Sequence, residues 1–255
     1  MEPELALAAP LVPRSTVGGW RAFARRAFRA WGHGQVEARL RAGLDGVHVH
    51  GLGHLREAAA RGPVIVAANH VCWWDGLVLV QLNHALTARG MVLMRADQLR
   101  RFSFFRSFGA LPLDTARPNQ ARRDLQAAAD RLRGPGDVLW IFPQGEHTPV
   151  ERRPLGFKPG VALLARLSGA PVVPVALRYP WAQAPRPAAA VRVGPAIPPG
   201  RRLLPALEHA VAALLDDALT EGPAGTPLVP PLRRPDRASP ALAWLHDRLL
   251  GGGDG

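Results

Sequence analysis

The sequence contains almost no cysteine, since Cys72 is the only one in 255 residues. A single cysteine excludes an internal disulfide framework and the paired cysteines of a zinc ribbon. Such a chain suits a reducing compartment, so we expect a cytoplasmic location.

Long hydrophobic runs are missing as well. The longest apolar window, residues 64–82, is interrupted by Asn69, His70 and Asp75, which argues against a membrane-spanning helix there. The first thirteen residues, MEPELALAAPLVP, have no positive region ahead of their apolar part. We therefore expect no signal peptide.

Lysine and acidic residues are scarce beside arginine. Lys158 is the only lysine, and the formal net charge is +12. Anionic partners are expected from this charge, and the classes that qualify are nucleic acid, anionic lipid and acidic or phosphorylated carriers. No helix-turn-helix, zinc-finger or RNA-binding signature occurs, so we expect no nucleic acid partner.

The N-terminal part of the chain contains an amphipathic segment, TVGGWRAFARRAFRAW, at residues 16–31. Aromatic and alanine side chains recur there at helical spacing, and arginines fall on the opposite face. This composition is typical of a helix in a membrane interface, and a helix packed on its own domain is the alternative. We expect the basic region 1–43 to hold the protein peripherally at the inner face of the membrane.

Short apolar runs alternate with helical patterns along the rest of the chain. Strands are expected at residues 47–50, 63–68, 91–95, 110–113, 138–142 and 172–177, with an edge strand at 191–193. Helices are expected around 75–88, 118–133, 158–168 and 202–220. This alternation predicts an α/β fold with a mostly parallel central sheet flanked by helices.

The predicted α/β domain spans residues 44–222. Residues 221–238 are rich in Pro, Gly and Arg, which predicts a linker. Ser239 followed by Pro240 predicts the start of a short C-terminal helix, so the region 223–255 is expected to be linker and helix.

Two polar side chains follow the apolar run 63–68, in the stretch ANHVCWWDGL. His70 and Asp75 fall in the loop that leaves the carboxyl end of the predicted strand, where open α/β sheets gather their chemistry. A histidine held by a carboxylate takes a proton from a hydroxyl and later returns it to a leaving group. No serine has a nucleophile-elbow context, so we expect the pair to activate a hydroxyl of the substrate.

The spacing of His70 and Asp75 alone leaves other chemistry open. Cys72 lies between them and offers a thiol nucleophile with His70 as its base. A metal site made of the pair together with Glu146 and His147 is a further alternative.

A second apolar run ends in a similar way, in VLWIFPQGEH at residues 138–147. FKPG at 157–160 then opens a helix, and APVVPV at 170–175 forms another strand. In this order the stretches resemble the 1-acylglycerol-3-phosphate acyltransferase (lysophospholipid acyltransferase) superfamily over roughly residues 44–200. The first block of that superfamily is Asn-His, four residues and Asp, its third is Phe-Pro-Glu-Gly, and its fourth is a Val-Val-Pro-Val strand.

The resemblance implies transfer of a fatty acyl group from acyl-CoA or acyl carrier protein to a lipid hydroxyl, with no cofactor and no metal. It implies that His70 is the general base and that Asp75 is its orienting partner. An acceptor-binding role is implied for Gly109, Asp114, Arg117, Gln144, Gly145, Glu146, His147 and Lys158.

Departures from the family pattern bear on the acceptor. Thr115 stands where the family often has an arginine, which leaves Arg117 as the nearest substitute. Gln144 replaces the usual glutamate, while Glu146 and His147 stand where Thr-Arg is common. A guanidinium suits bidentate contacts to phosphate. The absence of the family's arginine where His147 stands therefore predicts a neutral or sugar-like hydroxyl acceptor in place of lysophosphatidic acid.

Alternatives of other classes stay open. The same pair would serve a thioester hydrolase, in which water replaces the acceptor. A basic membrane-binding or nucleic-acid-binding protein without catalysis is the remaining alternative. For the acyltransferase, the expected partners are the acyl thioester, the lipid acceptor, acyl carrier protein and the membrane surface, contacted through the N-terminal helix.

Overall fold

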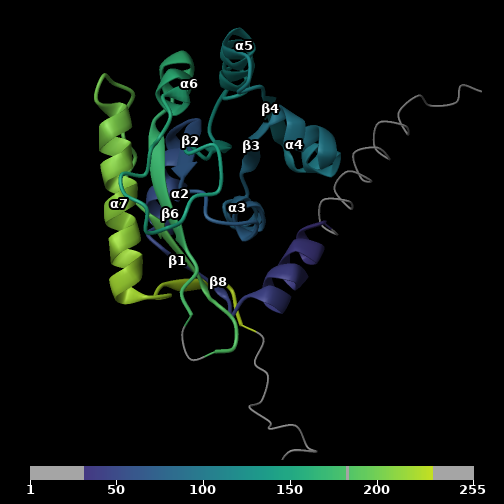
Figure 1. Cartoon of the computed structure of the whole chain (residues 1–255), viewed down its shortest axis with the longest axis vertical. Coiled ribbons are helices and arrows are strands. Elements are labelled where there is room, and N and C mark those ends of the chain that lie inside the picture. The colour runs from purple at the N-terminus through teal and green to yellow at the C-terminus, as the bar shows by residue number, and fades with distance from the viewer. Residues whose placement is uncertain (1–31, 182–183, 232–255) are drawn as a thin grey trace, which may run out of the picture.

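A computed structural model describes residues 32–181 and 184–231 (Figure 1). The membrane helix predicted at residues 16–31 and the helix predicted after Pro240 lie outside the described residues. The first described element is a helix over residues 32–43, which leads directly into the sheet.

An eight-stranded sheet forms the centre of the described chain, in the order β4-β3-β5-β2-β6-β7-β1-β8. Its strands are β1 (Val47–His50), β2 (Val64–Ala68), β3 (Arg89–Arg95), β4 (Ala110–Leu113), β5 (Asp137–Ile141), β6 (Val172–Arg178), β7 (Ala189–Val193) and β8 (Thr226–Val229). The neighbours from β4 to β6 run parallel, and so do β1 and β7, whereas β6–β7 and β1–β8 are antiparallel. The predicted mostly parallel sheet is therefore confirmed.

The middle strands owe their place to uninterrupted apolar sequence. Every residue of β2 and of β5 is buried. A strand covered on both faces favours a continuous apolar run over alternation, which is the pattern that these segments carry.

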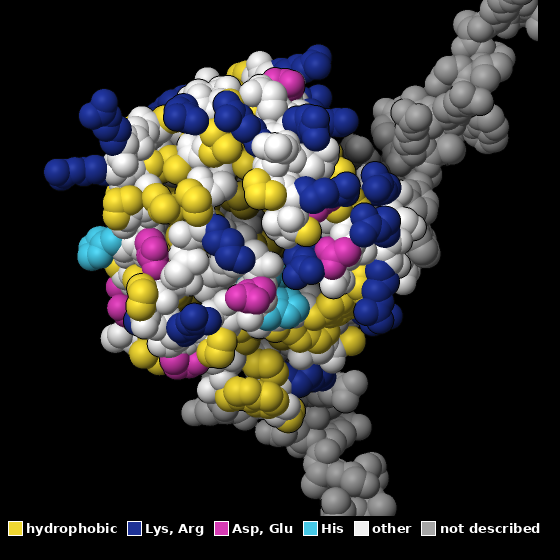
Figure 2. All heavy atoms as spheres, turned by 45° about the horizontal axis from the view of Figure 1, so that its top comes forward, with side chains coloured by type: hydrophobic (Ala, Val, Ile, Leu, Met, Phe, Trp, Pro, Cys, Tyr) yellow, Lys and Arg dark blue, Asp and Glu magenta, His cyan; other side chains and the backbone are white. Residues whose placement is uncertain are grey.

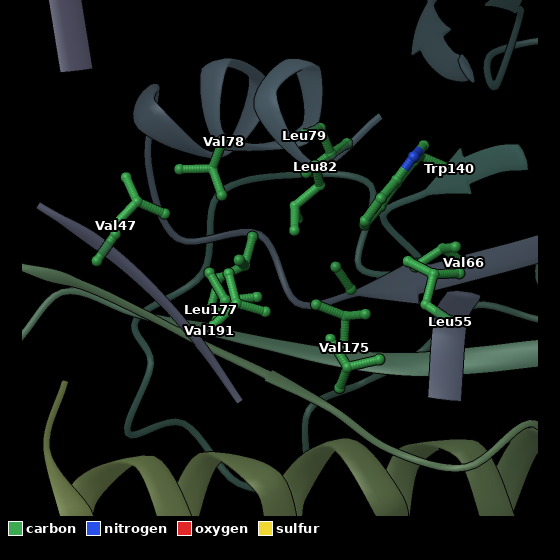
Figure 3. Close-up of a cluster of buried hydrophobic side chains, with 14 of the residues drawn as sticks. Val47, Leu55, Val66, Val78, Leu79, Leu82, Trp140, Val175, Leu177 and Val191 are labelled. Carbon is green, nitrogen blue, oxygen red and sulfur yellow. The ribbon is translucent and has the colours of Figure 1, made fainter. Parts of the chain in front are cut away.

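Helices cover both faces of the sheet. They are α2 (Leu52–Arg61), α3 (Trp74–Ala85), α4 (Ala96–Arg101), the 3-10 helix η1 (Ser103–Phe108), α5 (Pro118–Ala129), α6 (Gly160–Ser168) and α7 (Leu203–Glu221). Figure 3 shows Val78, Leu79 and Leu82 of α3 directed toward the sheet, where they join one buried cluster. Side chains of α5, α6 and α7 form the second cluster, on the other face. Within residues 32–181 and 184–231, no helix combines the length and the hydropathy that crossing a membrane requires.

The end of the sheet formed by β7, β1 and β8 differs from the sequence-based expectation. The strand expected at an edge, residues 191–193, belongs to β7 and lies inside the sheet between β6 and β1. Part of the predicted linker forms β8, which pairs with β1. The buried Arg192 stabilises this arrangement, because its guanidinium donates to the main-chain carbonyls of Gly222 and Ala224, at 2.8 and 2.7 Å, just before β8.

Candidate active site

The loops that follow β2, β5 and β6 leave the same edge of the sheet. These strands are adjacent and parallel, so their carboxyl ends lie side by side. The loop after β2 contains His70, the loop after β5 contains Gln144 to Thr148, and β6 is followed at once by Tyr179.

His70 and Asp75 form a hydrogen-bonded pair at this edge. His70 Nδ1 lies 2.7 Å from Asp75 Oδ2, and the Asp75 side chain is fully buried while that of His70 is 22% exposed. Because the carboxylate accepts the proton on Nδ1, the lone pair of the imidazole is on Nε2. Within the described residues, Nε2 has no hydrogen-bond partner, so the basic nitrogen is available to a substrate.

Asp75 is held in place by the turn that starts α3. Its Oδ2 also accepts the backbone N–H groups of Val71 and Cys72, at 2.7 and 3.1 Å. A side-chain oxygen that accepts N–H groups from the turn fixes the path of the chain there. The five-residue spacing of His70 and Asp75 therefore closes on itself, as the sequence predicts.

Tyr179 completes the contacts of the carboxylate. Its hydroxyl donates a 2.7 Å hydrogen bond to Asp75 Oδ1. Burial, together with the neighbouring Asp75 carboxylate, raises the pKa of Tyr179 well above its ordinary value. The phenol therefore remains a donor, and it fixes the second oxygen of the carboxylate.

Two buried amides position the backbone around His70. Asn69 donates to the carbonyl of Leu177 at 2.9 Å and accepts its N–H at 2.8 Å, which ties the end of β2 to β6. Gln144 accepts the N–H of His70 at 2.7 Å and donates to the carbonyl of Leu155 at 3.2 Å. The predicted contact of Gln144 with an acceptor stays a prediction, and the structure adds that its amide links the loops after β2 and β5.

Two aromatic rings contact the imidazole of His70. The Phe142 ring stacks on it with centroids 4.1 Å apart, and the His147 ring meets it edge-on at 4.2 Å. Burial, followed by the proximity of His70, lowers the pKa of His147. His147 is thus a neutral neighbour of the base at neutral pH, consistent with a site without a phosphate-binding cation at this position.

Cys72 has the properties of an unreactive thiol. Burial, followed by the Asp75 charge, raises its pKa to about 11. Its Sγ lies 3.9 Å from Asp75 Oδ1, so it faces the carboxylate. A thiol of this pKa is about one part in ten thousand thiolate at pH 7, which argues against the thiol nucleophile.

Gly145, Glu146 and Lys158 lie at the exposed side of the same loop. Gly145 has φ +75°, and a Cβ added there would lie 3.0 Å from Lys158 Nζ, so the ammonium sits against this glycine. Glu146 and Lys158 are exposed. The structure therefore brings these predicted residues to the rim of the site.

The remaining predicted acceptor residues lie apart from the pair. Asp114 follows β4, which is three strand positions from β2, or about 14 Å at the usual strand spacing. Arg117 donates to Asp114 Oδ2 from Nε at 2.8 Å, and this bond lowers the pKa of Asp114. Gly109 precedes β4 and so lies at the opposite edge, where a Cβ would approach the carbonyl oxygen of Gly90 to 2.4 Å.

No group of three or more His, Cys, Asp or Glu side chains in the described ranges is placed to hold a metal ion. His70 and His147 are in ring contact, but their carboxylate neighbour is already saturated with donors.

The sequence interpretation missed Tyr179, Asn69 and Phe142 as site residues. One signal was present for the tyrosine, since it is the only one in the chain and lies two residues after the strand predicted at 172–177. The stacking of Phe142 depends on the order of β5 and β2 in the sheet, which local sequence does not encode.

A family model described as acyltransferase matches residues 46–178, more than half of the chain. The comparison with curated proteins found no match to the chain. The matched range runs from the start of β1 to the end of β6 and therefore contains the pair and both loops around it.

Proposed function

This chain belongs to the acyltransferase family, and we propose that it transfers a fatty acyl group from acyl-CoA or acyl carrier protein to a hydroxyl of a lipid acceptor. One observation carries the proposal. His70 Nδ1 is 2.7 Å from a buried Asp75 carboxylate, while Nε2 has no partner among the described residues. This is the arrangement expected of a general base whose substrate brings the hydroxyl.

In the proposed reaction, Nε2 of His70 removes the proton of the acceptor hydroxyl as its oxygen attacks the thioester carbonyl carbon. A carbon–oxygen bond forms, and the carbon–sulfur bond then breaks. The imidazolium returns its proton to the departing thiolate, so that an ester and a free thiol result. Asp75 holds the tautomer and stabilises the imidazolium, while Tyr179 holds the carboxylate.

We further propose that the acceptor is a neutral, hydroxyl-bearing lipid. Several observations support this. His147, next to the base, has a lowered pKa, and Glu146 adds a negative charge to the rim. The guanidinium of Arg117 is paired with Asp114 and lies far from the base. Lys158 is the cation that competes with this view, since it lies against Gly145 at the site.

We also propose that the protein acts at the inner face of the cytoplasmic membrane. The net charge of +12 suits both an anionic leaflet and an anionic acyl donor. The amphipathic segment 16–31, which lies outside the described residues, is the proposed peripheral anchor.

The test is an assay of thiol release and of lipid product with one acyl-CoA and two acceptors, a neutral glycolipid and lysophosphatidic acid. We expect thiol release that depends on the glycolipid acceptor. The His70→Ala variant should lose this activity, and the Cys72→Ser variant should retain it. Equal thiol release without any acceptor would identify a thioesterase. Saturable transfer to lysophosphatidic acid alone would leave the acyltransferase standing and overturn the neutral acceptor.

A further inference from the structure

The loop after β5 is bonded to both peptide groups of His70. Gln144 accepts the backbone N–H of His70 at 2.7 Å, and the backbone N–H of Thr148 donates to the carbonyl of His70 at 2.8 Å. The residues between Gln144 and Thr148 are therefore held near the imidazole. One of them is His147, whose ring meets that of His70 edge-on with centroids 4.2 Å apart. A substrate bound at His70 thus comes close to the His147 ring.

Attack on a thioester requires a hydrogen-bond donor in addition to the base. Negative charge develops on the carbonyl oxygen as the acceptor oxygen bonds to the carbonyl carbon. Donors aimed at that oxygen usually make the largest single contribution to the rate. His70 does not serve this oxygen as well, because its Nε2 receives the proton of the acceptor hydroxyl. The site therefore needs a second group with an N–H to offer.

The backbone N–H groups closest to the imidazole already donate within the protein. The N–H of Gly145 donates to the carbonyl of Phe142 at 3.0 Å. Further backbone N–H groups around the site are also bonded to protein oxygens, and they belong to His70, Val71, Cys72, Thr148 and Lys158. These donors are not available to a substrate oxygen.

The side-chain donors around His70 are engaged in the same way, with His147 as the exception. The hydroxyl of Tyr179 donates to Asp75, and the amide of Gln144 donates to a main-chain carbonyl. Within the part of the chain that the structure describes, neither ring nitrogen of His147 has a hydrogen-bond partner. The side chain of His147 is also exposed. Figure 2 shows a histidine beside an acidic side chain at the surface, near the middle of the viewed face.

The charge state of His147 suits a donor at this place. Burial, followed by the proximity of His70, lowers the pKa of His147, so its imidazole is neutral at neutral pH. A neutral imidazole still has one N–H to donate. A second imidazolium there would instead repel the one that forms when His70 takes the proton.

We propose that the imidazole N–H of His147 donates a hydrogen bond to the carbonyl oxygen of the acyl thioester and stabilises the negative charge that develops on it. This inference rests on the proposed function, because it assigns a donor to the thioester that His70 attacks through the acceptor. His147 gives up no proton in the step. The charge returns into the carbonyl bond when the carbon–sulfur bond breaks, and His70 protonates the departing thiolate.

The test compares His147→Phe with His147→Gln in the full chain, with one acyl-CoA and a neutral glycolipid as acceptor. Phenylalanine keeps a ring beside His70 without an N–H, whereas glutamine keeps an N–H donor without the ring. His209→Phe is the matched control, because His209 is exposed on α7, which packs on the other face of the sheet. Circular dichroism and thermal melting establish that each variant is folded.

We expect kcat of the His147→Phe variant to fall by about 10²–10³, which is the usual cost of removing one such donor, with the KM of both substrates unchanged. The His147→Gln variant should keep kcat within about tenfold of the wild type, because an amide N–H replaces the lost donor. The control should match the wild type. The same ranking should hold for thiol release without an acceptor, because hydrolysis passes through the same charged intermediate. A wild type that only hydrolyses acyl-CoA, with this ranking kept, would defeat the proposed transfer to a lipid and leave the role of His147 standing.

Three results would overturn the inference. Equal losses of kcat in the His147→Phe and His147→Gln variants would show that the ring matters and the donor does not. A raised KM of the acceptor with normal kcat would assign His147 to acceptor binding. A loss of kcat in Lys158→Met, with normal kcat in His147→Phe, would make the ammonium of Lys158 the donor.

Discussion

The loops after β2 and β4 leave the same edge of the sheet, and each contains an aspartate with a basic partner. Asp75 is fully buried and accepts hydrogen bonds from His70, Tyr179 and two backbone N–H groups. Asp114 is bonded mainly by Arg117, and the side chain of Asp114 is 15% exposed while that of Arg117 is 76% exposed. The two pairs have similar short contacts and very different surroundings.

The difference teaches that burial, more than distance, separates an organised site from a surface ion pair. A buried carboxylate whose oxygens all accept hydrogen bonds cannot rotate, so it fixes the orientation of the imidazole. An exposed pair is screened by water and gives up side-chain entropy, and its usual worth is about 0–1 kcal/mol. The predictions below test this contrast.

The largest effect is expected from Asp75→Asn, with Asp114→Asn as the matched control. An amide at position 75 favours the wrong tautomer of His70, so kcat should fall by roughly 10³–10⁴. The control should keep activity within about threefold. Steady-state kinetics of acyl transfer measure both, and equal losses would erase the contrast between the two loops.

The next effect concerns the reactivity of Cys72. Its pKa of about 11 means that the thiol stays protonated until well above neutrality, so alkylation should be about a hundredfold slower at pH 8 than that of an ordinary thiol of pKa 9. The rate should rise about tenfold per pH unit from pH 7 to 10, without the plateau of an ordinary thiol. Mass spectrometry after iodoacetamide treatment checks this, and a plateau near pH 8 would contradict the buried environment.

A smaller loss is expected for Tyr179→Phe. Removing the hydroxyl leaves Asp75 Oδ1 with only the weak thiol contact, so the free energy of unfolding should drop by about 1–3 kcal/mol. We expect kcat to fall about tenfold while the KM of the acceptor is unchanged, because the phenol acts through the carboxylate. Urea unfolding and kinetics measure the two effects. A raised KM with normal kcat would instead place Tyr179 against the acceptor.

The smallest effect is expected for Arg117→Gln. Loss of this exposed pair should leave the melting temperature almost unchanged, and added salt should shrink any difference further. Thermal melting at low and high salt measures it. A marked rise in the KM of the acceptor would bring Arg117 into the site despite its distance from His70.

Much of the fold was predictable because the responsible signals are local. The apolar runs of β2, β5 and β6 and the helical patterns of α3, α5, α6 and α7 occur at the predicted places. The place of β7 inside the sheet was not predictable, because it depends on β1 and β8 pairing beyond it and on the buried Arg192. Local residues determine whether a segment forms a strand, whereas the packing of the whole sheet determines which strands lie beside it.

The same division holds at the site. The sequence by itself predicted that a tight turn brings Asp75 back to His70, and the structure shows the pair with the turn's own N–H groups on the carboxylate. Only the tertiary structure decided that Tyr179 and Gln144 secure this pair, that Phe142 stacks on the imidazole, and that Arg117 stays away. Those contacts join strands distant in sequence, and burial between them sets which polar groups are fixed and which remain in water.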